Sequence, residues 1–243
     1  MLSTKKDIIQ QLQKDLLLLQ GFKSLPGTAI NPGLGIINNA FPNKTFPTGA
    51  IHEFISDATE QSAATSGFVA GLLASFMKEG KVCVWIGRSV KVFPPALKSF
   101  GVEPEQIIFI DLQRDKDLLW AMEEALKCEG LATVVGEINE INFTASRRLQ
   151  LAVEKSRVTG FLLRQCPRTI NTIACVARWK IISLPGKLDN NMPGVGFPRW
   201  NVELLKVRNG KPGAWQMEWI NNRFQLVHQP IPSLQYEEKR KAG

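Results

Sequence analysis

The sequence predicts an α/β fold in which a mostly parallel, twisted sheet is flanked by helices and gains antiparallel strands toward the C-terminus. Two patterns predict it. Short apolar runs alternate with helical patterns from Gly49 onward, and longer strand patterns follow, two of them joined across an Asn-Gly pair. At 243 residues, the chain is long enough for one domain with a substantial core.

The alternating region defines the parallel half of the sheet. Its expected strands are 51–55, 82–86, 107–110, 132–135 and 160–163, and its expected helices are 65–78, 93–100, 118–127 and 144–156. Strands that are apolar throughout are buried on both faces, so we expect helices on both sides of the sheet and right-handed crossovers between its strands.

The last third of the chain has longer strand patterns, at 173–182, 199–207 and 214–220. Asn209-Gly210 lies between the last two, and this dipeptide is a strong hairpin signal. Residues 185–198 hold three prolines and three glycines, which predicts a long irregular loop. These strands are expected to pair antiparallel beside the parallel sheet.

The chain is expected to divide into an amphipathic helix within 1–20, a linker at 21–34, one folded domain at 35–228 and a disordered tail at 229–243. The apolar stripe of the helix either packs on its own domain or is offered to another subunit. No cleavage site follows it, and no stretch reaches about 18 consecutive apolar residues, so we expect a cytoplasmic protein without membrane contact.

Composition narrows the function classes. Lysine and arginine exceed aspartate and glutamate by 30 to 22, a net charge of +8, which favours an anionic partner such as nucleic acid but also occurs in proteins that bind none. The four cysteines form no C-x-x-C pair and there are two histidines, so we expect reduced thiols and neither a metal site nor a disulfide framework.

A degenerate phosphate loop is the most informative local feature. Residues 48–55 predict a strand, and 62–67 follow where a nucleotide-binding enzyme would place Gly-Lys-Thr. Ala63 and Ala64 stand where the glycine and lysine would be. Thr65 and Ser66 could still hold an anion weakly at a helix N-terminus, or this segment is simply a helix N-cap.

Several strings resemble known proteins. Residues 46–53 resemble the strand that enters the phosphate loop of RecA-type recombinases, and 143–152, 194–200 and 204–213 together resemble the ImuA family of bacterial damage-inducible mutagenesis. The resemblance runs from about Lys6 to Phe224. It implies a RecA-like domain, a place in the SOS response and translesion synthesis, and an accessory role beside ImuB, an inactive Y-family polymerase homologue, and an error-prone polymerase.

Carried over position by position, the RecA ATPase residues are mostly missing. The strand at 133–135 ends in Gly136 where an aspartate would support Mg²⁺, and Glu137, one residue later, is expected to face the opposite side of the sheet. We therefore expect a noncatalytic protein without a resident cofactor; ATP binding at the degenerate site stays an alternative.

The candidate interaction residues are cations on helix, strand and hairpin patterns, together with one tryptophan: Arg147, Arg148, Arg157, Arg178, Arg199, Trp200, Arg208 and Lys211. An aromatic beside an arginine is typical of protein interfaces, which favours the pair at 199–200. The others fit solvated faces or contacts with phosphates or acidic groups. The leading hypothesis is a scaffold that binds ImuB; the alternative is a protein that binds DNA or regulates RecA filaments.

Overall fold

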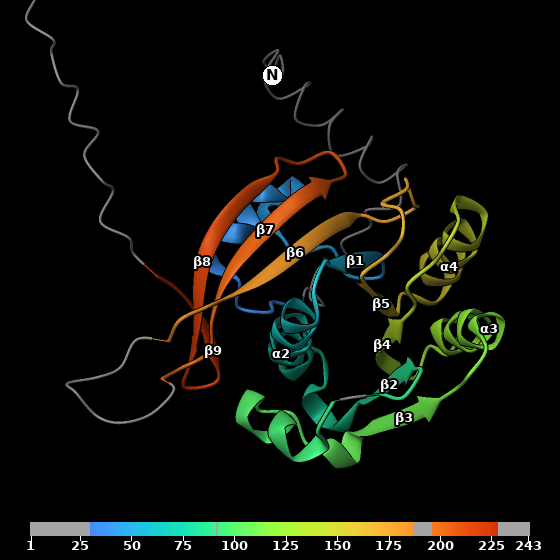
Figure 1. Cartoon of the computed structure of the whole chain (residues 1–243), viewed down its shortest axis with the longest axis horizontal. Helices are drawn as coiled ribbons and strands as arrows, with labels where there is room; N and C mark the ends of the chain where they lie inside the picture. The colour runs from blue at the N-terminus through green and yellow to red at the C-terminus, as the bar shows by residue number, and fades with distance from the viewer. Residues whose placement is uncertain (1–29, 91, 187–195, 228–243) are drawn as a thin grey trace, which may run out of the picture.

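The computed structural model describes residues 30–90, 92–186 and 196–227, which form a nine-stranded sheet in the order β3-β2-β4-β5-β1-β6-β7-β8-β9 (Figure 1). The expected N-terminal helix and C-terminal tail lie outside these residues. The strands are β1 Ile51–Ser56, β2 Val82–Gly87, β3 Ile107–Asp111, β4 Leu131–Glu137, β5 Thr159–Gln165, β6 Ala177–Leu184, β7 Arg199–Val207, β8 Gly213–Ile220 and β9 Arg223–Leu226.

The parallel half confirms the predicted alternation. Strands β1 to β6 pair parallel, and the α-helices between them are α2 Thr59–Phe76, α3 Asp115–Leu126 and α4 Phe143–Ser156. The expected helix at 93–100 is instead a 3-10 helix, η4 Pro94–Phe100. Four shorter 3-10 helices are η1 Gly35–Ala40, η2 Pro42–Lys44, η3 Lys78–Gly80 and η5 Pro104–Gln106.

Helices cover both faces of the parallel half. Figure 1 shows α2 on one side of the sheet, with α3 and α4 on the other. Phe54 of β1 packs with Phe68 of α2, whereas Ile51, three residues earlier and therefore on the opposite face of the strand, packs with residues of α3 and α4. Period-two alternation along β1 therefore distributes its apolar side chains between two separate cores.

The antiparallel half has one covered face. Strand β6 pairs with β7, β7 with β8 and β8 with β9, all antiparallel. Trp179, Trp200 and Phe224 point toward α2, where Gly71 allows close approach: a Cβ there would lie 2.7 Å from the ring of Phe224. The opposite face of β6–β9 carries mostly charged and polar side chains, as expected for an antiparallel sheet with one solvated side.

Two sequence predictions for this half are revised. The strand expected from 173 begins at Ala177, because the preceding residues form an irregular segment in which Val176 N–H donates to Ile51 C=O. Strand β9 was not expected, since its four residues carry too short a pattern to recognise. No helix among the described residues is both long and apolar enough to cross a bilayer.

Candidate functional site: the β1–α2 junction and the charged residues around it

The junction that would hold a nucleotide is too short for a phosphate loop. Strand β1 ends at Ser56 and α2 begins at Thr59, so only Asp57 and Ala58 connect them. Residues 62–67, which stand where a nucleotide-binding enzyme would place Gly-Lys-Thr, lie within α2, and α2 begins six residues before the helix expected from 65. A phosphate loop needs a longer glycine-rich connection whose N–H groups surround the phosphates.

The helix N-terminus is occupied by the chain's own polar groups. The N–H of Asp57 donates to Gln61 Oε1 at 2.9 Å, and Glu60 places a carboxylate in the first turn. Asp57 pairs with Lys180 of β6 at 2.5 Å. Carboxylates are stabilised at a helix N-terminus, and here they stand where an incoming phosphate would meet like charge.

Neither of the two predicted anion-binding residues lies in the first turn of α2. Thr65 is 2% exposed, and its hydroxyl is hydrogen-bonded to that of Ser56 at 3.0 Å, which ties α2 to β1. Ser66 is half-buried in the second turn of the helix. Neither residue is the helix N-cap, since Ala58 holds that position with an extended backbone.

Glu137 occupies the end of β4. The strand runs two residues beyond the predicted end, and Trp85 Nε1 donates to Glu137 Oε1 at 2.8 Å. A Cβ on Gly136 would lie 2.5 Å from the Met122 sulfur on the α3 side. The two neighbours thus face opposite sides of the sheet, as predicted, and the Glu137 carboxylate is engaged with the β2 tryptophan.

A buried ion cluster lies beside β1 on the face toward α4. Glu53 is fully buried and accepts from Arg164 Nη1 at 2.9 Å and from Arg178 Nε at 2.6 Å. Arg164, with a side chain 0% exposed, also donates to the backbone oxygens of Asn139 and Thr169. The cluster therefore joins β1, β5 and β6 to the loops around them.

Asn171 extends the cluster. Its side-chain oxygen accepts from Arg164 Nη1 at 3.1 Å, its backbone oxygen from Arg178 Nη2 at 2.6 Å, and its amide donates to Ile141 C=O at 2.7 Å. Cys175 Sγ lies 3.6 Å from Glu53 Oε2, and burial is the main cause that raises the pKa of this thiol to about 12. Nearly every polar atom of the cluster thus has a partner within the protein.

Sequence reasoning missed Glu53 and assigned Arg178 to an exposed strand face. The correction follows from the topology: β1 lies between β5 and β6, so its charged residue is buried and needs partners from its neighbours. Charged residues inside apolar strand runs, Glu53 in β1 and Arg164 in β5, were the available signal.

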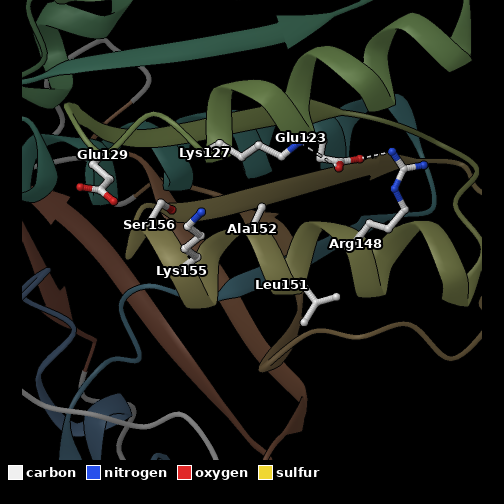
Figure 2. Close-up of a pocket in the computed structure, with 8 residues that line it drawn as sticks. All are labelled: Glu123, Lys127, Glu129, Arg148, Leu151, Ala152, Lys155 and Ser156. Carbon is white, nitrogen blue, oxygen red and sulfur yellow. Dashed lines mark ion pairs between the residues drawn. The ribbon is translucent and has the colours of Figure 1, made fainter.

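The predicted arginines of α4 face α3 and their own helix. Arg148 pairs with Glu123 at 2.5 Å and Arg147 lies 3.8 Å from Glu154. Figure 2 shows Arg148 and Lys127 converging on Glu123 from the two helices. They line a shallow groove of about 320 Å³ with Glu129, Leu151, Ala152, Lys155 and Ser156.

The structure corrects the prediction that residues 199–200 anchor a protein partner. Trp200 is 3% exposed and packs edge-on against Phe68, because alternation along β7 puts it on the core side with Val202. Arg199 is largely covered, and its Nε lies 4.0 Å from Glu218 Oε1 on the neighbouring strand β8. These two side chains therefore point to opposite faces of the sheet and do not form one anchor.

The remaining predicted cations lie at the opposite end of the sheet from the β1–α2 junction. Arg157 follows α4 as its C-cap with a left-handed backbone (φ 66°), and Arg208 and Lys211 belong to the β7–β8 hairpin. The structure thus separates the predicted residues into four groups: Arg178, which is largely covered in the ion cluster, the pair at 199–200, the α4 pair, and this group of three.

Comparisons with known proteins place the fold and the family. No family model matches the chain. A KaiC-like protein from the hyperthermophilic archaeon Pyrococcus horikoshii has a similar structure, with a TM-score of 0.55 and 14% identity over 84% of this chain and all of that one, which supports a RecA-like fold. Protein ImuA from two strains of Caulobacter vibrioides is 31% identical over 205 residues, 79% of this chain and 84% of that protein. The chain belongs to the ImuA family.

Proposed function

We propose that this protein is a noncatalytic accessory subunit in DNA-damage-induced mutagenesis, acting in the cytoplasm within a translesion synthesis complex. Family membership and the RecA-like fold support a role in SOS-linked mutagenesis. The proposed partner is an ImuB-type inactive polymerase homologue and, through it, an error-prone polymerase. The work of the protein is then assembly rather than nucleotide hydrolysis.

The β1–α2 junction is the observation that carries the noncatalytic part. Phosphoryl transfer depends on phosphate positioning and on cations that neutralise developing charge. Here the connection is two residues long, and the first turns of α2 hold no lysine in place of the missing phosphate-loop lysine. The carboxylates of Asp57 and Glu60 border the opening. This arrangement opposes a bound triphosphate and supports a structural role for the domain.

A nucleotide-binding assay tests this part of the proposal. A ligand at 100 times its dissociation constant stabilises a protein by about 2.7 kcal/mol, so a well-bound nucleotide would raise the melting temperature clearly. We expect no shift with millimolar ATP and Mg²⁺, and no ATP hydrolysis with single-stranded DNA present. Hydrolysis that disappears in a Glu137→Gln variant would contradict the proposal.

A further inference from the structure

A row of exposed or half-exposed cations lies along the end of the sheet at which the parallel strands begin, which we call the amino edge. The row comprises Lys44 of η2, Lys155 of the last turn of α4, Lys206 of β7, and Arg208 and Lys211 of the β7–β8 hairpin. We propose that this amino edge binds the phosphate backbone of duplex nucleic acid without regard to base sequence.

Backbone contacts show that these segments form one continuous edge. The N–H of Lys211 donates to Ala40 C=O at 2.9 Å, which places the hairpin beside the η1–η2 segment. The N–H of Arg208 donates to Val176 C=O at 2.7 Å, just before β6. The row therefore continues from the hairpin to the start of the central strands.

The end of α4 completes the row. A Cβ on Gly49, just before β1, would lie 3.3 Å from the backbone of Arg157, so the chain that leaves α4 runs alongside the chain that enters β1. Lys155 lies two residues earlier. Strands are about 4.8 Å apart, so the three steps from β5 through β1 and β6 to β7 spread the cations over about 15 Å.

The cations of the amino edge form no ion pair within the part of the chain that the structure describes. Within residues 30–90, 92–186 and 196–227, no carboxylate lies within 4.0 Å of a side-chain nitrogen of Lys44, Lys155, Lys206, Arg208 or Lys211. At the other end of the sheet, three cations are paired: Arg88–Asp115, Arg114–Asp117 and Lys180–Asp57. Lys116 and Arg168 at that end also form no ion pair among the described residues, so the amino edge is distinguished by five unpaired cations in one row.

Nucleic acid fits this edge better than an acidic protein does. Protein interfaces are centred on aromatic and apolar anchors, and single-strand binders stack bases on exposed aromatics. The exposed aromatics among the described residues all lie away from the amino edge: Phe93 after β2, Trp120 within α3, Phe143 at the start of α4 and Phe197 before β7. Trp215, at the start of β8, is half-buried, so the amino edge carries cations without a fully exposed aromatic. Such a row matches repeated phosphates, which a duplex presents at about one charge per 1.7 Å of its axis.

The test compares two charge-matched variants of the full chain. Lys206→Gln/Lys211→Gln removes two cations from the amino edge, and Lys116→Gln/Arg168→Gln removes two exposed cations from the other end of the sheet. Binding to a fluorescent duplex of random sequence is measured by anisotropy between 50 and 200 mM salt. Each phosphate contact contributes about 0.9 to the slope of log K against log salt, so the amino-edge variant should lose about 1.8 of that slope.

The wild type and the control variant should both bind the duplex. Between 50 and 200 mM salt, the affinity of the amino-edge variant should fall by a factor about tenfold smaller than theirs. No duplex binding at 50 mM salt would overturn the proposal, as would equal weakening by both variants. Binding to polyglutamate as tight as binding to the duplex would indicate an acidic protein as the partner and overturn the nucleic-acid assignment. Complex formation with ImuB is measured separately, so the duplex-binding result can be interpreted even if no complex forms.

Discussion

Replacement of Glu53 by glutamine should destabilise the protein strongly without changing its shape. Glutamine keeps the length of the side chain but supplies one oxygen, whereas Glu53 accepts from Arg164 and Arg178 with different oxygens. The new NH₂ group would face a guanidinium donor, and the buried Arg164 would lose its counterion. Breaking a buried pair in this way costs about 3 to 5 kcal/mol.

That cost is a large share of the stability of a domain, which is on the order of 5 to 15 kcal/mol. For a domain of this size it corresponds to a fall in melting temperature of roughly 6 to 20 °C. Urea unfolding followed by tryptophan fluorescence measures the free energy directly. The slope with urea should match that of the wild type, since the surface exposed on unfolding is unchanged.

Glu140→Gln is the matched control. Glu140 lies 3.9 Å from Arg164 but its side chain is 43% exposed, so the same substitution should cost less than about 1 kcal/mol. A triple change of Glu53, Arg164 and Arg178 to methionine should recover much of the loss, because no charge is then left buried and unpaired. A Glu53→Gln protein within about 1 kcal/mol of the wild type would refute the reasoning.

Three further predictions follow from burial. Trp200→Ala should cost about 3 to 5 kcal/mol of unfolding free energy, and Arg199→Ala should cost less, in the same urea assay; equal costs would contradict the core position. Burial lowers the pKa of His52 from 6.5 to about 4. The free energy of unfolding should therefore fall by about 3 kcal/mol as the pH drops from above 6.5 to 4, and a His52→Gln variant measured in parallel should lose this pH dependence. Ellman's reagent should find two fast-reacting thiols in the native protein, the exposed Cys128 and Cys166, and four in denaturant; rapid reaction of all four native thiols would contradict the burial of the others.

The sheet could be predicted from the sequence because its central strands are buried on both faces. Mostly apolar runs marked β1 to β5, and the alternation of Arg199–Val207 predicted the bounds of β7 to the residue. The Asn-Gly pair identified the β7–β8 hairpin, where Asn209 has the positive φ of 56° that such turns favour. These signals are local and therefore visible in one sequence.

The start of α2 could not be predicted in the same way. Thr59, Glu60, Gln61 and Ser62 are polar and lack the apolar repeat of a helix, so the first turn was assigned to a loop. In the folded chain, this turn is helical: the N–H of Asp57 donates to the Gln61 side chain, and Ser62 is buried. Tertiary contacts here override the local pattern.

The ion cluster was hidden for another reason. Glu53 finds Arg164 and Arg178 at separations of 111 and 125 residues, so no local pattern links them. Trp200 was likewise placed at an interface from its neighbour's charge, although its own position in the alternation of β7 puts it in the core. Predicting the cluster required the strand order first, whereas the alternation of β7 was a local signal for Trp200.

Assembly with the partner is the central claim, and co-elution tests it most directly. The full chain would be mixed with the ImuB-type homologue of the same organism and separated by size-exclusion chromatography at moderate salt without nucleotide. We predict a comigrating complex that forms equally well with and without ATP and Mg²⁺. Separate elution of the two proteins under both conditions, and also with single-stranded DNA present, would contradict the account.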